Sequence, residues 1–166
     1  IMAYHGISEC FGRTDRWFCG IVVTNGAGSP RSGRYAALTE EQMLQTRRDE
    51  QKKAAVVGEY GAVALLDYPS PQVRDAQNPA PTEDLLVLLE ALRPRVVYTH
   101  NLADKHDTHV AVALRTISAL RRLPHEARPE SLLGCEVWRD LDWLSEEDKV
   151  GLDVQARGNL ATALLG

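Results

Sequence analysis

Three histidines lie close together in one polar segment, and their spacing could place imidazole rings around a metal ion. The segment contains His100, His106 and His109 and follows the apolar run 96–99. His106 and His109 are three residues apart, so at the start of a helix their rings can point to one side. Neutral imidazole is a common zinc ligand. The pattern also fits one histidine that caps a helix and another that is simply exposed, because His-x-x-His is weak evidence without further ligands.

A charged pair on a second segment could bind a polar ligand. Arg47 and Glu50 recur at helical intervals with apolar residues, so the pair is predicted to share a stripe with them. A charge that faces the protein needs a partner or a ligand. The alternatives are an intrahelical ion pair beside the core, or a solvated helix face.

Two loops could complete a ligand site. The Thr-Asn-Gly-Ala-Gly-Ser loop at 24–29 contains Asn25 and could let backbone amides approach a ligand. It lacks the spacing of a dinucleotide fingerprint or a P-loop, so an ordinary turn is the alternative. Arg139 and Asp140 follow another apolar run and could reach the same rim, although a structural ion pair is the favoured alternative.

The elements that must position these residues alternate between strands and helices. Short apolar or β-branched runs predict strands at 17–24, 62–66, 96–99 and 135–138. Amphipathic segments predict helices at 39–57, 82–92, 108–123 and from about 159 onward, and Thr39 with Gln42 has the spacing of a capping box. The stretch 69–81 is predicted to be a long surface loop.

This alternation is typical of a parallel sheet with helical crossovers. In open α/β sheets, ligands bind beyond the carboxyl ends of the strands. The histidine segment follows a predicted strand, so it is expected at that edge. We interpret residues 1–166 as a single domain.

Composition narrows the range of partners. The chain has 19 Lys plus Arg and 23 Asp plus Glu, a formal net charge of -4, which gives no overall attraction for nucleic acid or an anionic membrane. A small neutral or modestly charged substrate suits it better. Three scattered cysteines without a Cys-x-x-Cys pair, and no apolar run of membrane-spanning length, lead us to expect a cytoplasmic protein.

Taken in order, these motifs resemble the LmbE-like or PIG-L family of zinc-dependent de-N-acetylases. The loop at 24–29 resembles that family's Thr-Asn/Asp-Gly-x-Gly-Ser loop, and Arg47 with Glu50 resembles its Arg-x-x-Glu helix, here followed by an Ala-Ala pair and Gly58. His106-Asp-Thr-His109 resembles its His-Pro-Asp-His signature. The resemblance runs through nearly the whole chain.

The resemblance implies a Rossmann-like three-layer sandwich with a mostly parallel sheet and a zinc-dependent enzyme acting on a small acetamido-sugar substrate. It implies that His109 is a zinc ligand and that His106 is a general acid or electrostatic stabiliser. Arg47 would line the substrate pocket, and Asn25 and Arg139 are the further substrate-binding candidates from their loops. The orienting carboxylate of the family's signature would be shifted by one place or lost here, because Asp-Thr replaces Pro-Asp.

A larger departure concerns the family's His-Pro-Asp-Asp-x-Glu segment, which would supply two metal ligands and the catalytic aspartate. It is not found in these 166 residues, and His5 lies past its place and is no substitute. Residues 1–11 resemble the helix that follows the segment, and the chain stops at Gly166 inside an apolar helical pattern. We therefore expect a fold truncated at both ends, weak zinc binding and little or no activity. A homo-oligomer is possible.

Two other functions fit parts of the sequence. Lys105-His106-Asp107 has a superficial likeness to the His-Asp metal pair of metal-dependent phosphohydrolases, which should be mostly helical. A non-catalytic domain that binds a sugar or nucleotide through its loops is the third hypothesis.

Overall fold

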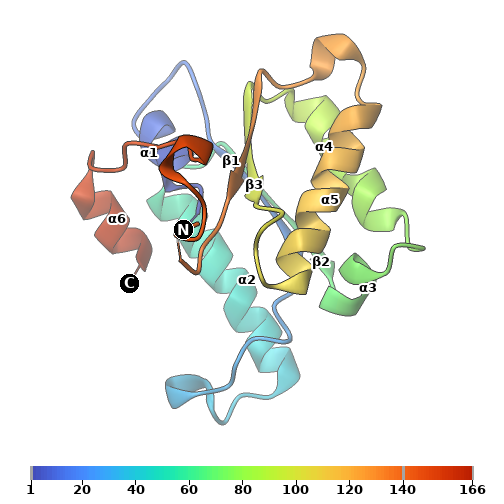
Figure 1. The fold of residues 1–166 in the computed structure, drawn as a ribbon. Coiled ribbons are helices and arrows are strands. Elements are labelled where there is room, and N and C mark those ends of the chain that lie inside the picture. The colour runs from blue at the N-terminus through green and yellow to red at the C-terminus, as the bar shows by residue number, and fades with distance from the viewer. Residues whose placement is uncertain (1, 140, 166) are drawn as a thin grey trace.

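The computed structural model describes residues 2–139 and 141–165, and its helices and strands alternate as the sequence predicts (Figure 1). The strands are β1 (Cys19–Thr24), β2 (Ala62–Tyr68), β3 (Val96–His100) and β4 (Ser131–Cys135). The α-helices are α1 (Tyr4–Cys10), α2 (Glu40–Val57), α3 (Ser70–Arg74), α4 (Ala80–Leu92), α5 (Asp107–Arg122) and α6 (Gly158–Leu165). Three short 3₁₀ turns, η1 (Gly33–Tyr35), η2 (His125–Ala127) and η3 (Glu146–Asp148), lie between them.

The strands form two parallel pairs. β1 pairs with β2 from Cys19 opposite Ala62, and β3 pairs with β4 from Val96 opposite Ser131. Within residues 2–139 and 141–165, no strand pairing joins β1 to β3. Parallel strands connected by helices confirm the predicted α/β class, but the sheet is divided into two halves.

Local signals account for the position of α2. Thr39 is the N-cap residue, and its hydroxyl accepts a hydrogen bond from the main-chain N–H of Gln42 at 3.2 Å, while the Gln42 side chain accepts one from the Thr39 N–H at 2.9 Å. This reciprocal pair satisfies two amides that a helix start would leave unpaired. The predicted capping box is therefore confirmed.

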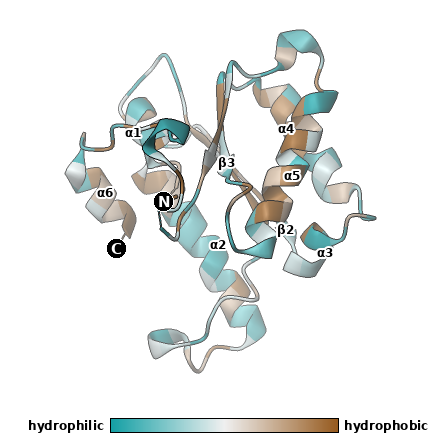
Figure 2. Ribbon diagram, in the orientation of Figure 1, coloured by the Kyte–Doolittle hydropathy of each residue, from teal (hydrophilic) through white to brown (hydrophobic). Residues whose placement is uncertain are grey.

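One hydrophobic core joins both strand pairs to the helices on one side. Val23 of β1, Leu85 and Leu89 of α4, and Ala119 and Leu120 of α5 are buried in it. Partly buried side chains from β2 and β3 pack against the same cluster. Figure 2 shows the brown, apolar surfaces of α4 and α5. Both pairs therefore rest on one helical layer.

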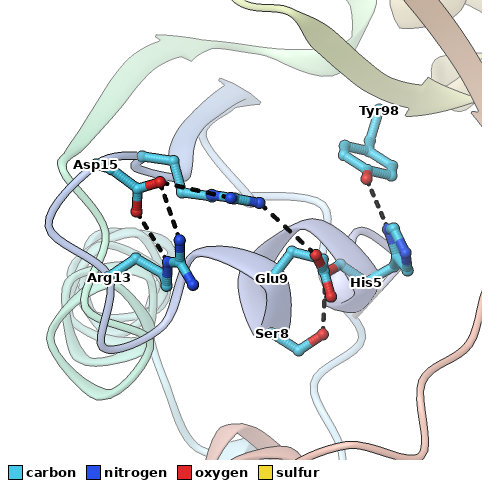
Figure 3. A network of polar contacts seen from close by, with 7 residues as sticks. His5, Ser8, Glu9, Arg13, Asp15 and Tyr98 are labelled. Carbon is cyan, nitrogen blue, oxygen red and sulfur yellow. Dashed lines mark hydrogen bonds and ion pairs between the residues drawn. The ribbon is translucent and has the colours of Figure 1, made fainter.

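The first helix lies against β3 and against the last helix. Nδ1 of His5 and the hydroxyl of Tyr98 are 2.8 Å apart, which ties α1 to β3 (Figure 3). The side chains of Tyr4 and Ile7 form a buried cluster with Leu160 of α6. His5 thus has a structural partner, in agreement with its exclusion from the metal ligands.

Two sequence predictions about boundaries are wrong. The fourth strand was expected at 135–138 but ends at Cys135, because the Glu136 carboxylate binds the main-chain N–H groups that follow it and folds them into a turn. The stretch 69–81 was expected to be a loop, yet it contains α3 and the start of α4. Pro71 and Pro81 lie in the first turns of these helices, where a missing N–H costs nothing.

Among the described residues, no helix is both long enough and apolar enough to cross a membrane.

Candidate metal and substrate site

The three histidines gather where β3 passes into α5. His100 is the last residue of β3, His106 is the N-cap of α5, and His109 lies in the first turn of that helix. In Figure 1, α5 and α2 each begin at their own lower end. This is the edge at which the sequence predicts a site.

The ring of His109 is flanked by the other two imidazoles. Its centroid lies 4.0 Å from that of His100 with the planes 6° apart, and 4.5 Å from that of His106 at 27°. The indole of Trp138 is farther away, at 6.4 Å and 25°. These contacts restrict the rotation of the His109 ring.

Asp104 fixes the same ring through a hydrogen bond. Its side chain has no solvent exposure; one oxygen accepts the main-chain N–H of His106 at 2.8 Å, and the other lies 2.9 Å from Nδ1 of His109. A carboxylate only accepts, so the network assigns the proton to Nδ1. The Nε2 lone pair of His109 is therefore the one available to a metal.

The charge of Asp104 is maintained by the same bonds. Burial raises the pKa of this carboxyl, but the N–H of His106 and the ring of His109 lower it by more, and the resulting pKa lies below its usual range. Both carboxylate oxygens already accept hydrogen bonds, one from His106 and one from His109. Asp104 is thus better suited to orient His109 than to bind the metal directly.

His100 is a poor candidate for a second ligand in the same arrangement. The ligand atoms of His100, Asp104 and His109 lie within 4.8 Å of one another. However, imidazole lone pairs lie in the ring plane, and two parallel rings 4.0 Å apart cannot both direct them at one ion about 2 Å away. Burial, followed by the nearby His109, lowers the pKa of His100 to about 4, so its ring is neutral.

One further observation indicates that the site is built for an additional polar group. Nδ1 of His100 is buried and has no hydrogen-bond partner among the described residues. Buried polar atoms are normally paired. This unpaired nitrogen fits a further polar group such as a water molecule, whereas Nε2 of His109 remains the candidate metal donor.

The His106 side chain both caps α5 and is exposed to solvent, which are the two alternatives to a metal role that the sequence left open. Its Nδ1 accepts the main-chain N–H of Thr108 at 3.3 Å, so it caps α5. In the neutral ring the proton then lies on Nε2, and the side chain is exposed. Nε2–H can therefore donate to a substrate oxygen without disturbing the cap.

Arg47 and Asn25 line one cavity at the ends of β1 and β2. The cavity has a volume of about 190 Å³ and is also lined by Ser29, Arg48 and Asp67. Nε of Arg47 donates to the Ser29 hydroxyl at 2.9 Å, and the Asn25 side chain accepts the N–H of Ala27 at 3.1 Å. The predicted substrate residues Arg47 and Asn25 are thus brought together.

Glu50 restrains the guanidinium from the other side. Nη1 of Arg47 donates to Glu50 at 2.6 Å, and the Tyr35 hydroxyl donates to the second oxygen at 2.9 Å. Burial raises the pKa of Glu50, but the bonds from Tyr35 and Arg47 outweigh this and keep the pKa below its usual range. The intrahelical ion pair considered for these residues is present, and it leaves Arg47 on the cavity wall.

Gly26 is required by the contact between the loop and α2. Its φ is +75°, and a Cβ added there would lie 2.7 Å from Cγ of Arg47. Only glycine combines this backbone conformation with so close an approach. The small-residue loop therefore determines where Arg47 lies.

The structure does not bring Arg139 into this cavity. Its guanidinium is exposed and donates to the Asp142 carboxylate at 2.7 Å and 3.0 Å, so an ion pair accounts for it. Asp140, named with it, lies outside the described residues.

Sequence reasoning missed Asp104 and Trp138. The only available signal for Asp104 was a carboxylate two residues before His106 in a polar loop. Nothing local marked Trp138, because its nearness to His109 depends on the pairing of β4 with β3.

Comparisons with known proteins identify the family and the fold of the chain. A family model described as PIG-L: GlcNAc-PI de-N-acetylase matches residues 8–120, more than half of the chain. No curated protein sequence matches it.

Two solved structures are similar in fold. An N,N'-diacetylchitobiose deacetylase from Pyrococcus horikoshii superposes with a TM-score of 0.69 at 14% identity, over 98% of this chain and 62% of that one. A conserved protein from Thermus thermophilus superposes with a TM-score of 0.65 at 18% identity, over 98% of this chain and 70% of that one. The chain thus spans less than two thirds of the deacetylase, and the predicted fold class is confirmed.

Proposed function

The chain belongs to the PIG-L, GlcNAc-PI de-N-acetylase, family, and from this premise we propose that it is part of a metal-dependent hydrolase that removes N-acetyl groups from an amino-sugar-containing substrate. The proposed metal is zinc, because imidazole nitrogen and carboxylate oxygen are among its usual ligands. The substrate would be a small acetamido sugar.

The observation that carries the proposal is the orientation of His109. Its Nδ1 is held by the buried Asp104 at 2.9 Å, which leaves Nε2 directed away from that bond. A ligand histidine whose second nitrogen binds a carboxylate is a recurring arrangement at zinc sites. We propose that His109 Nε2 is one metal ligand and that Asp104 sets its tautomer.

Other side chains of the chain would act on the substrate. A bound zinc would activate water and polarise the acetamide carbonyl. His106 would donate a hydrogen bond from Nε2–H to the developing oxyanion. The proton for the leaving amine would come from the attacking water, by way of a catalytic aspartate outside the described residues. Arg47, fixed by Ser29 and Glu50, would hold the sugar through hydrogen bonds.

We also propose that catalysis needs residues beyond those described. β1 and β3 rest on the same core, yet within the described residues they do not pair with each other. A further parallel strand between them would complete one sheet, and its carboxyl end would lie beside His109. We propose that such a strand carries the remaining metal ligands and the catalytic aspartate, so the 166 residues alone bind zinc weakly and turn over little substrate.

The experiment compares zinc content and deacetylation in the full-length protein and in His109→Ala. The matched control is His125→Ala, an exposed histidine in η2 after α5. We expect His109→Ala to lose zinc and release of acetate from N,N'-diacetylchitobiose, and His125→Ala to retain both. Unchanged zinc content in His109→Ala would remove the proposed ligand. A full-length wild-type protein without zinc would favour the non-catalytic binding domain.

The competing phosphohydrolase is tested on the same samples. Parallel strand pairs count against that mostly helical class. Hydrolysis of p-nitrophenyl phosphate without acetate release would nevertheless select it. Deacetylation by the 166 residues alone at the rate of the full-length protein would refute the need for a further strand.

A further inference from the structure

Trp138 is exposed beside the candidate metal ligand. It follows β4, which is parallel to β3, so both strands deliver their next residues to the same edge. Its indole lies 6.4 Å from the His109 ring, centroid to centroid, and is 56% exposed. Isolated exposed aromatic residues are common and need no function. A role for Trp138 therefore requires that its position is fixed.

The main chain at Trp138 is fixed by a buried carboxylate. Glu136 is 7% exposed and accepts the N–H groups of Trp138 at 2.6 Å and Arg139 at 2.8 Å, with a longer contact from Leu141 at 3.4 Å. Burial raises the pKa of Glu136, but these N–H groups lower it by more, so the carboxylate stays charged. A charge is costly to bury unless it is hydrogen-bonded. Its bonds here hold the start of the turn that carries the indole.

The indole lies outside the hydrophobic core. Trp138 is absent from both hydrophobic clusters of the described residues, and more than half of its side chain is open to solvent. The turn therefore presents a large flat side chain on a main chain that is held by the hydrogen bonds of Glu136. Rigid aromatic side chains of this kind bind ligands at low entropic cost.

We propose that the indole of Trp138 is a stacking surface for the pyranose ring of the substrate; this inference rests on the proposed function. A pyranose has hydroxyls at its rim and C–H groups on its faces, and such C–H groups match the negative face of an aromatic ring. An acetamide attached directly to that ring would place the sugar next to the group being hydrolysed. Trp138 thus selects acetamido sugars over acyclic acetamides.

The test follows indole N–H signals of the isotope-labelled full-length protein by NMR during titration with N-acetylglucosamine. Trp17 is the matched control, since it is 63% exposed but precedes β1 and so lies toward the opposite edge. We expect the Trp138 signal to shift saturably and the Trp17 signal to remain. Trp138→Ala should weaken binding about threefold to tenfold, whereas Trp138→Phe and Trp17→Ala should stay close to wild type.

Two results would overturn the inference: a Trp138 signal that does not shift, or an unchanged Kd in Trp138→Ala. Deacetylation of N,N'-diacetylchitobiose by the same variants separates it from the proposed function. A saturable shift without acetate release supports the sugar surface and rejects the hydrolase. Acetate release with an unchanged KM in Trp138→Ala supports the hydrolase and rejects the sugar surface. If the inference is correct, the KM of Trp138→Ala rises and its kcat changes less.

Discussion

The carboxylate of Asp104 lies 2.9 Å from Nδ1 of His109 and is fully buried. The sequence left the orienting carboxylate of the signature shifted by one place or lost. The structure supplies one from the preceding loop instead, five residues before His109. Asp107, the acidic residue inside the signature, is exposed at the start of α5.

Replacing Asp104 with Asn is expected to weaken zinc binding by about 10- to 100-fold, because the amide cannot hold both hydrogen bonds of the carboxylate and no longer fixes the His109 tautomer. The measurement is competition with a chromogenic chelator in the full-length protein. Asp107→Asn is the control and should bind zinc like wild type. Equal affinity in Asp104→Asn would show that the buried carboxylate does not orient the ligand.

The contact between Gly26 and Arg47 predicts a second effect. Gly26→Ala places a Cβ against the Arg47 side chain at a positive φ, so we expect a loss of stability of about 1 kcal/mol or more. Gly28→Ala is the control, since a Cβ there meets no atom within 4 Å. Urea denaturation of both variants provides the comparison. Equal midpoints would mean that the loop can move away from α2.

The buried His100 predicts a pH dependence of stability in the metal-free protein. Its pKa is about 4 when folded and 6.5 in the reference state, so between these values the unfolded chain binds a proton that the folded chain does not. The stability that the neutral ring contributes is therefore complete above about pH 6.5 and falls as the pH decreases toward 4.

His100→Phe keeps a flat ring and removes this titration. Thermal unfolding in the presence of a chelator should show the Tm of wild type falling more steeply than that of the variant between pH 6.5 and 4. The depressed pKa values of Asp104 and Glu50 cost stability at low pH in both proteins, so only the difference is informative. Parallel curves would contradict the prediction.

Arg115 predicts the largest structural effect. Its guanidinium, which extends from α5, is buried and donates to the main-chain carbonyl of Val73 in α3 and to those of Asp75 and Asn78 in the segment between α3 and α4. Arg115→Met removes the donor to the carbonyls of Val73 and Asn78, whereas the Asp75 carbonyl keeps its hydrogen bond from the Asn78 N–H. We expect a loss of about 2–4 kcal/mol in the free energy of unfolding. Arg121→Met, exposed on the same helix, should lose far less. Similar losses in both would refute a specific role.

The sequence predicted those elements whose signals are local. The capping residues Thr39 and Gln42 lie within one turn, and the apolar runs of β1, β2 and β3 are bounded by polar or turn residues. β4 was displaced because its limits depend on pairing with β3 and on the bonds of Glu136, neither of which is visible in composition.

The candidate site shows the same division. His106 and His109 could be identified from their spacing, because three residues make nearly one helical turn. Asp104 could not, since its role requires the loop after β3 to fold back until both carboxylate oxygens meet their donors. Arg139 shows the converse case. Its position near a strand end suggested a substrate contact, but its guanidinium forms an ion pair with Asp142, three residues away.

The divided sheet has a consequence for handling the protein. In the described part of the chain, β1 and β3 each have one edge without a strand partner. The N–H and C=O groups of such an edge can pair with other extended chains, and natural proteins normally cover or close it. Kept as these 166 residues, the polypeptide should recruit copies of itself and form β-rich aggregates at high concentration. A synthetic peptide that pairs with the free edges of both β1 and β3 should keep the polypeptide monodisperse.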